Sequence, residues 1–264
     1  PYGDIWLKLR PLAYKVHPYQ WPTIGKNIDH IAGASLEEVE DFFHRFYAPD
    51  NAILSISGNI TDEKALELVK KWFGDIPPAR YKRKALPMEP QQTEERRLVC
   101  EHNKVPADAI YKVYHMGDRR SDNFYTCDTI SDILSNGQSS RLYINLIKNG
   151  KLFSEIDAYI TGDMDPGLFI FSGKLSEGVA IEEAEAAIQN EIDRFIEDPI
   201  SERELQKVIN KTEARISYSE INYQGKSANL AFFDYLGDIN LINSECTPYA
   251  EVSLDSIKQT AREL

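Results

Sequence analysis

Apolar positions in the first eighty residues predict two amphipathic helices separated by a strand. Residues 35–46 carry one apolar stripe at helical spacing, and Glu38 follows Ser35 by three positions, which predicts a capping box at the start of this helix. Residues 52–57 form an almost continuous apolar run, which predicts a mostly buried strand. Thr61 is placed to cap the second helix. The stripe of the first helix consists of Leu36, Val39, Phe42, Phe43 and Phe46.

The chain before and after this region has a different pattern. Turn formers and aromatics in residues 1–34 predict a helix remnant followed by an irregular loop. From residue 96 onward, strands and helices alternate, and Ser139 or Ser140 is expected to cap a short helix reaching about Lys148. The other predicted elements are strands at 97–102, 109–115, 152–161 and 168–175, and helices at 122–135, at 180–197, from the capping box of Ser201 and Glu204, and from Ser253.

Residues 77–95 are expected to be an inter-domain linker. Four prolines (Pro77, Pro78, Pro87 and Pro90) alternate with the cations Arg80, Lys82, Arg83 and Lys84, a composition that keeps the backbone extended and solvated. The expected division is therefore residues 1–76, a linker at 77–95 and a second domain at 96–264. Two strands followed by helices, repeated, predict an α+β fold with helices gathered on one face of an antiparallel sheet.

Composition narrows the function classes. The 264 residues carry 30 Lys and Arg against 42 Asp and Glu, a net charge of −12. This charge disfavours binding to nucleic acids and to anionic membrane surfaces. No apolar run approaches the roughly 20 residues that cross a bilayer, so we expect a soluble protein without a membrane span, in a compartment that stays open. Because the chain begins at Pro1 without a signal-peptide pattern, we expect a fragment or a processed product.

Few residues suggest a reaction. Cys100, Cys127 and Cys246 form no C-x-x-C pair, which disfavours a structural zinc site. Nucleotide-binding glycine loops are absent, and the serines after Gly137 lack the closing glycine of a nucleophile elbow. Glu40 and His44, four residues apart, are compatible with one side of a metal site, but we favour a solvated acidic helix face.

The remaining candidates also favour structural roles. His17, among aromatics, is expected to be packed or hydrogen-bonded. His102 and His115 lie on predicted strands, where each points away from its sequence neighbour. Asp163, Asp165 and Gly167 resemble the start of a calcium loop, but Lys174 stands at the twelfth position, so we expect a hairpin turn. Residue chemistry alone therefore predicts an α+β protein without a complete active site.

Several short stretches in a fixed order carry a family resemblance. They are His-Pro-Tyr at 17–19, Thr-Ile-Gly at 23–25, Phe-Tyr-Ala-Pro-Asp-Asn-Ala-Ile-Leu at 46–54, Gly-Asn-Ile at 58–60, Trp-Phe-Gly-Asp-Ile-Pro at 72–77 and Asn-Gly-Gln-Ser-Ser-Arg-Leu at 136–142. Together they resemble the insulinase/pitrilysin family of zinc metallopeptidases, relatives of the mitochondrial processing peptidases. The resemblance implies two insulinase-like α+β units, the first of them incomplete.

The resemblance also implies that the reactive groups lie outside this chain. Family members bind zinc through H-x-x-E-H and a later glutamate, all upstream of the His-Pro-Tyr stretch. We therefore expect no catalytic and no metal-binding residue here, no cofactor in this chain, and zinc in the full-length protein. The substrate-binding residues stay unknown. Some relatives grip the substrate with an Arg and a Tyr seven residues apart; alignment on Leu146 and Leu152 places Ile147 and Ser154 at these positions.

The leading hypothesis is that this chain is the non-catalytic portion of such a peptidase and helps to wall a peptide chamber. Its partners would be a peptide substrate and a second peptidase-like half, on the same chain or another. One alternative is a non-catalytic homologue that serves as a structural or partner subunit. Another is an unrelated module that binds peptides at an exposed sheet edge.

Overall fold

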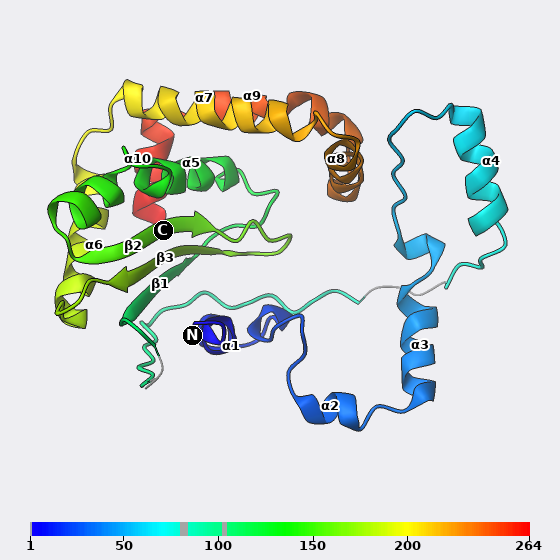
Figure 1. The fold of residues 1–264 in the computed structure, drawn as a ribbon, viewed down its shortest axis with the longest axis horizontal. Helices are drawn as coiled ribbons and strands as arrows, with labels where there is room; N and C mark the ends of the chain where they lie inside the picture. The colour runs from blue at the N-terminus through cyan, green and yellow to red at the C-terminus, as the bar shows by residue number, and fades with distance from the viewer. Residues whose placement is uncertain (1, 80–83, 102–104) are drawn as a thin grey trace.

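The computed structural model describes residues 2–79, 84–101 and 105–264, and shows a helical first part followed by a sheet with helices (Figure 1). Arg80, Lys82 and Arg83 of the expected linker, and His102, lie outside the described residues. The first part contains α1 (Ile5–Ala13), α2 (Ile28–Ala32), α3 (Leu36–Phe46) and α4 (Asp62–Phe73), with 3₁₀ turns η1 (Pro18–Gln20) and η2 (Pro49–Asn51). The second part contains α5 (Phe124–Ser135), η3 (Tyr143–Asn149), α6 (Ile181–Glu197), α7 (Glu202–Ser219), α8 (Tyr223–Leu236), η4 (Ile239–Ser244), α9 (Cys246–Ala250) and α10 (Leu254–Glu263).

A three-stranded antiparallel sheet organises the second part. Its strands are β1 (Ala109–His115), β2 (Phe153–Ile160) and β3 (Leu168–Leu175), in the order β1-β3-β2. β2 and β3 form a hairpin whose connection contains Asp163, Asp165 and Gly167, as expected. Within this hairpin, Gly173 of β3 lies so close to the Phe153 ring of β2 that a Cβ atom at position 173 would be 2.6 Å from the ring. The α+β class predicted from the sequence is confirmed.

The central strand β3 is apolar on both faces. Phe169 and Phe171 pack into the main core with α5, α6 and α10, while Leu168 and Ile170 pack against α1 on the opposite face. The main helical layer therefore covers one face, as predicted, and α1 from the first part contacts the other. Burial of apolar surface is the dominant favourable contribution to folding, and β3 buries such surface on both faces. β3 is therefore the centre of the core in the second part.

Three helix starts follow the predicted capping chemistry. Ser35 and Ser201 form capping boxes with Glu38 and Glu204, and the Thr61 hydroxyl accepts the backbone N–H of Lys64. The Ser253 start is also confirmed, with α10 beginning at the next residue. The expected cap by Ser139 or Ser140 is wrong. The helix that follows these serines is the π-helical turn η3, which has no side-chain cap. The Ser139 hydroxyl instead accepts a hydrogen bond from Lys207 Nζ, and the Ser140 hydroxyl is buried.

Two predicted strands do not form. Residues 52–57 and 97–101 have no strand hydrogen bonding. A strand requires a neighbouring strand to bond with, and the sheet found in the described residues consists of β1, β2 and β3 alone. Ile53, Leu54 and Ile56, predicted to be mostly buried, are accordingly exposed. Apolar patterning identified residues that suit a sheet, but hydrogen-bonding partners decide whether they join one.

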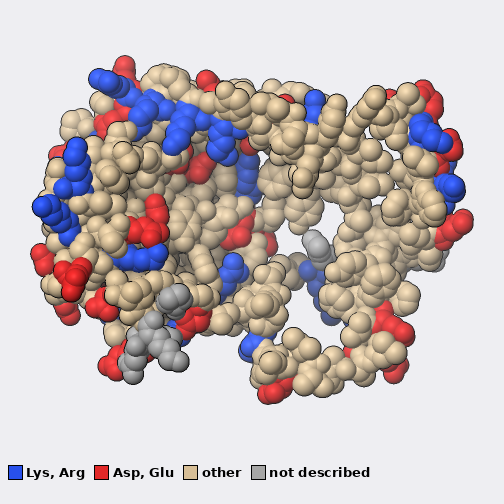
Figure 2. All heavy atoms as spheres, viewed as in Figure 1, with Lys and Arg blue, Asp and Glu red and all other residues tan. Residues whose placement is uncertain are grey.

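The helices of the first part leave their apolar stripes uncovered. The large side chains of α3 and α4 are exposed although both helices are amphipathic; the exposed set includes Leu36, Val39, Phe42, Phe43, Leu66, Trp72 and Phe73. Figure 2 shows the charged side chains of this part gathered along its outer edge, with uncharged atoms on the side toward the second part. Among the described residues, no helix is both long and apolar enough to cross a membrane.

Truncation of a fully buried core residue should destabilise the second part more than truncation of an exposed one. Ile188 of α6 has no exposed surface, so Ile188→Ala should lower the free energy of unfolding by about 2–5 kcal/mol, measured by denaturant titration. Ile181→Ala on the same helix, where the side chain is partly exposed, is the control and should cost about 1 kcal/mol or less. Equal effects of the two changes would contradict the observed core.

Candidate functional site: the junction of residues 2–19 with the sheet

Residues 2–19 lie on the face of the sheet opposite the main helical layer. Leu9 and Ala13 of α1, with Tyr14, are buried against Leu168 and Ile170. In Figure 1 this segment crosses below the strands, and residues 84–101 run beside it. Polar contacts with this second segment hold α1 and the turn after it in place. We call these contacts, together with those that α1 and the following turn make to β1 and to the β2–β3 turn, the junction.

Glu89 anchors the turn that follows α1. Its carboxylate accepts the backbone N–H groups of Lys15, Val16 and His17 at 2.7, 2.8 and 2.8 Å. Burial of this side chain tends to raise its pKa, but the three amides favour the charged form, and the pKa lies below its ordinary value. One ionised carboxylate thus satisfies three amides at the turn after α1.

The end of α1 is held by two side chains of the second segment and of β1. Arg96 Nη1 donates to the carbonyl oxygens of Leu12 and Ala13 at 3.1 and 3.0 Å, and His115 Nε2 donates to the Ala13 oxygen at 3.1 Å. Burial lowers the pKa of His115, so the ring is neutral at pH 7 and still donates. Arg96 also places a positive charge beside the last carbonyls of α1, where it interacts favourably with the helix dipole.

An aromatic cluster closes the junction toward the β2–β3 turn. The Tyr14 hydroxyl donates to the Pro166 oxygen at 3.1 Å, and the Tyr19 hydroxyl accepts the Asp165 N–H at 3.3 Å. His17 is buried between these rings; its Nδ1 accepts the Tyr19 N–H at 3.2 Å, and its Nε2 lies 3.5 Å from the Asp165 carboxylate. The packed, hydrogen-bonded role predicted for His17 is confirmed.

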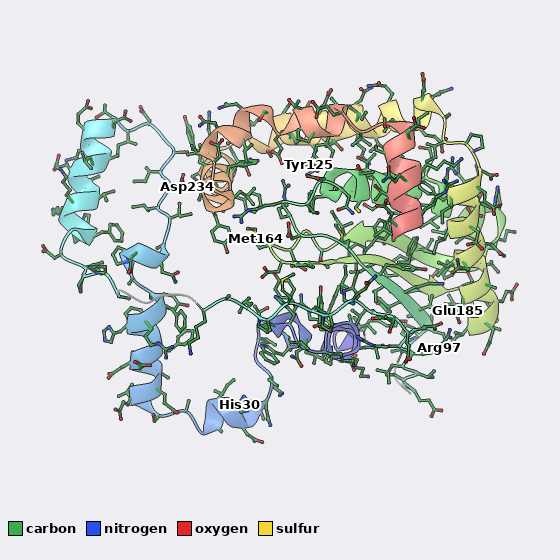
Figure 3. The ribbon with its side chains drawn as sticks, turned by 180° about the vertical axis from the view of Figure 1, so that it is seen from behind. His30, Arg97, Tyr125, Met164, Glu185 and Asp234 are labelled. Carbon is green, nitrogen blue, oxygen red and sulfur yellow. The ribbon has the colours of Figure 1, made fainter. Side chains whose placement is uncertain are left out.

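An exposed ion pair extends the junction to α6. Arg97 and Glu185, labelled in Figure 3, face each other, and the guanidinium donates to both carboxylate oxygens at 2.7 and 2.5 Å. Because Arg97 is largely exposed, solvent screens this pair, and it contributes little to stability compared with the buried contacts.

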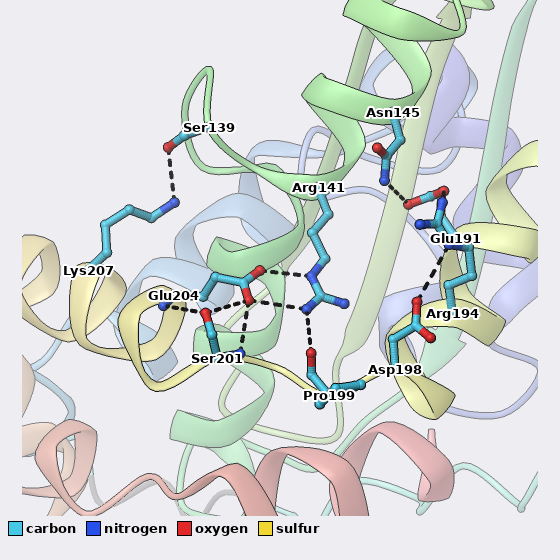
Figure 4. Close-up of polar contacts among 10 residues, drawn as sticks. All are labelled: Ser139, Arg141, Asn145, Glu191, Arg194, Asp198, Pro199, Ser201, Glu204 and Lys207. Carbon is cyan, nitrogen blue, oxygen red and sulfur yellow. Dashed lines mark hydrogen bonds and ion pairs between the residues drawn. The ribbon is translucent and has the colours of Figure 1, made fainter.

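A second polar cluster supports the π-helical turn η3 (Figure 4). Arg141 donates to both carboxylate oxygens of Glu204 at 2.9 and 3.2 Å and to the Pro199 oxygen at 3.3 Å. Burial tends to raise the pKa of Glu204, but the bonds from Arg141 and Ser201 outweigh it and lower the pKa to about 2. One carboxylate therefore both caps α7 and holds the segment before η3.

The structure places the other sequence candidates apart from one another. Ile147 packs against the main core, and the exposed Ser154 donates from its hydroxyl to the Lys174 oxygen. Glu40 and His44 lie on exposed positions of α3. Within residues 2–79, 84–101 and 105–264, no three His, Cys, Asp or Glu side chains lie close enough together to hold a metal ion.

Sequence patterns did not identify Glu89 or Arg96 as junction residues. Both stand near or inside the segment predicted as a solvated linker, where charge is expected anyway. Their partners are backbone groups between Leu12 and His17, which leave no trace in side-chain patterns. Chemically, the junction can position one part of the chain against the other. Apart from the buried His17 Nε2, its polar groups bond to the backbone or to one another and do not form a nucleophile facing a base.

Comparison with known proteins gives consistent results. The family model described as "Peptidase M16 inactive domain" matches residues 33–212. Zinc protease PqqE of Helicobacter pylori is 26% identical over the whole chain, which covers 60% of that protein, and the uncharacterized zinc protease YmxG of Bacillus subtilis is 22% identical over 97% of the chain, which covers 61% of that protein. The chain thus spans about three fifths of the length of these relatives.

A solved structure shows the same fold. The crystal structure of a protease from Helicobacter pylori superposes on the whole chain with a TM-score of 0.90 at 22% identity, and the chain covers 64% of that structure. The N-terminal segment and the sheet-containing part are therefore both included in the shared fold.

Removal of the Glu89 charge should loosen the junction. Glu89→Gln weakens three bonds to backbone amides and should lower the free energy of unfolding at pH 7 by about 1–3 kcal/mol, measured by urea denaturation. Since the folded pKa is lowered, the wild-type contribution is complete above the ordinary value of 4.5 and is lost as the pH falls through the folded pKa. Glu94→Gln, on an exposed carboxylate, is the control; a similar loss there would contradict the assignment.

Removal of the Arg141 charge should release Glu204. Arg141→Met should lower the free energy of unfolding by about 1–3 kcal/mol at pH 7 and move the pKa of Glu204 from about 2 toward 4.5, followed by NMR titration. In the wild type this contribution is lost between about pH 4.5 and pH 2 as the carboxylate is protonated. The control is Lys207→Met, which removes only the bond to Ser139. An unchanged Glu204 pKa in the Arg141 variant would refute the role of this pair.

Proposed function

Because this chain belongs to the peptidase M16 family, as its inactive domain, we propose that it is the non-catalytic part of a longer zinc peptidase and forms part of the wall of a peptide chamber. The family expected from the sequence is confirmed by the family match and by the zinc-protease relatives. The chamber, the substrate and the second peptidase-like half belong to the proposal.

The observation that carries the proposal is the contrast between the two parts. The second part encloses a core around β3, whereas α3, α4 and residues 52–57 of the first part expose their apolar side chains. An exposed set of this size marks a contact surface. Relatives of greater length have further residues available to cover it. We therefore assign residues 1–76 to the end of a first unit, 77–95 to a linker and 96–264 to the second unit.

The chemistry of the described residues fits this division. A catalytic zinc site needs three protein ligands and an open position for water, and the described residues contain no such group of ligands. Zinc would bind the longer protein through residues outside this chain, and no step of the reaction is assigned to residues of this chain.

The positions that align with the Arg and Tyr of some relatives also carry no charge or phenol here. Ile147 faces the core and Ser154 bonds the backbone of β3, so neither can stabilise a developing oxyanion. This feature favours one alternative, in which the longer protein is a non-catalytic homologue that serves as a partner subunit. The zinc content of the longer protein distinguishes the two functions.

The test compares the chain of 264 residues with the longer protein that contains it. We expect the longer protein to bind about one zinc ion and to cleave fluorogenic peptides, with activity lost on chelation and restored by zinc. The shorter chain should be inert toward the same peptides. A longer protein without zinc and without turnover would exclude the peptidase and favour the partner-subunit alternative; chelator-sensitive turnover by the shorter chain would refute the non-catalytic role.

A further inference from the structure

A buried cation lies where the loop between β1 and α5 meets α8. Arg119 of this loop is 7% exposed. Its guanidinium carbon lies 4.2 Å from the centre of the Phe124 ring, 5.0 Å from that of Tyr125 and 5.8 Å from that of Phe232. Aromatic faces attract a guanidinium at such distances. Because the rings belong to α5 and α8, they hold the cation between two helices.

The side chain of Arg119 has no hydrogen-bond acceptor and no ion-pair partner among the described residues. Its backbone N–H donates to the Asp163 oxygen at 2.9 Å, but the guanidinium uses none of its N–H donors within this part of the chain. In the same residues, the fully enclosed polar side-chain atoms without a partner are His17 Nε2 and Ser140 Oγ, so the Arg119 nitrogens still touch solvent. A nearly buried charge is costly unless it is paired. The site thus favours an acceptor that arrives from outside the chain.

Neighbouring carboxylates do not meet this need. Asp118 accepts the backbone N–H of Arg120 at 2.8 Å. The charge of Arg119 acts on Glu245, but the two side chains form no ion pair. Burial raises the pKa of Glu245 in spite of this charge, so the attraction of Arg119 does not make up for the loss of water around the carboxylate. Arg119 is therefore held in place without a direct counter-ion in the described residues.

The cation lies at one end of the second part. In Figure 3, Tyr125, Met164 and Asp234 mark the start of α5, the β2–β3 turn and α8, and these three elements meet there. Arg119 belongs to this place because its backbone bonds the β2–β3 turn and its side chain contacts Tyr125 and Phe232. Figure 2 shows open space between this end of the second part and the first part. A ligand can thus approach the three elements from that side.

The surroundings of Arg119 suit a carboxylate that is attached to an apolar group. A planar guanidinium binds a carboxylate through two parallel N–H bonds. Phe232 and Tyr235 of α8 are 39% and 46% exposed, so they offer apolar surface that a bare inorganic anion would not use. The net charge of −12 repels anions from the chain as a whole, so binding depends on these local contacts.

We propose that Arg119 binds a carboxylate of a peptide, and that Phe232 and Tyr235 contact the apolar side chain next to that carboxylate. The C-terminus of a peptide and an acidic side chain present the same two oxygens, and the test below separates these sources. This inference rests on the proposed function for its ligand class, a peptide. It requires neither zinc nor turnover.

Peptides that differ in one carboxylate test the site. The probes are acetyl-Ala-Ala-Ala-Leu with a free C-terminus, the same peptide with a C-terminal amide, and acetyl-Ala-Glu-Leu-Ala with a C-terminal amide. NMR titration of the chain of 264 residues should show at least about tenfold tighter binding for one of the carboxylate peptides than for the neutral peptide, as expected for a hydrogen bond to a charged group. The tighter of the two carboxylate peptides identifies the source.

Matched variants locate the binding. Arg119→Met should remove the preference for the carboxylate, whereas Arg120→Met, which removes the exposed neighbouring cation, should change it by less than about twofold. Arg119→Lys keeps the charge without the planar fork and should retain only part of the preference. If Arg119→Met does not fold, the comparison of the peptides on the wild-type chain still decides.

Equal binding of the three peptides, an unchanged preference in Arg119→Met, or phosphate binding as tightly as the carboxylate peptides would overturn the inference. The longer protein, with zinc removed by a chelator to prevent cleavage, should show the same preference. Loss of binding there would mean that another segment occupies the site, and would also overturn the inference. Carboxylate-dependent binding by both proteins, with no zinc and no turnover in the longer one, would refute the proposed function alone. Turnover by the longer protein with equal binding of the three peptides would refute this inference alone.

Discussion

The placement of the first segment of the chain on the sheet depends on how the turn after α1 is held. Three successive backbone amides point at the carboxylate of Glu89, and Arg96 and His115 bond the last carbonyls of α1. Ala13 and His17 are buried, so without these partners the Ala13 carbonyl and the His17 amide would be left unsatisfied, at a cost comparable to a lost hydrogen bond for each group. With them, a segment from the start of the chain covers a face of β3 that would otherwise be exposed. The start of the chain is therefore held on the sheet by bonds to its backbone groups, not only by apolar contact.

The sequence predicted the elements whose signals are local. Ser35 and Ser201 began helices as capping boxes, and β1, β2 and β3 formed within one or two residues of their predicted bounds. Failures occurred where the outcome depends on distant residues. Residues 52–57 have strand composition but no strand to pair with among the described residues. Ser139 and Ser140 precede the π-helical turn η3 without capping it, and Arg141 and Asn145 beside them bond to the distant residues Glu204 and Glu191. Glu89 and Arg96 looked like linker charges because their partners are backbone atoms some 70 to 85 residues away.

The family resemblance and the residue chemistry lead to the same view of the chain. The resemblance implies that the reactive groups lie outside this chain. The residues at the two aligned positions, Ile147 and Ser154, are engaged in core packing and in a bond to the backbone. Positions that contribute to stability in this way are poor candidates for catalysis, because a catalytic group must be free to meet a substrate.

The apolar character of β3 on both faces has a consequence for how this strand finds its place. In a sheet with one solvated face, a slip by one residue would bury polar side chains, and polarity alone keeps the pairing correct. Here a slip would exchange Phe169 and Phe171 with Leu168 and Ile170, all of them apolar, so in this half of the strand polarity does not reject it. In the other half, a slip would turn Ser172 and Lys174 toward the main core, and polarity opposes it there. Shape adds to this constraint: a Cβ atom at position 173 would lie 2.6 Å from the Phe153 ring, so the ring packs over the residue that has no side chain, Gly173. A single glycine thus contributes to the alignment of the hairpin, beside the polar positions of β3.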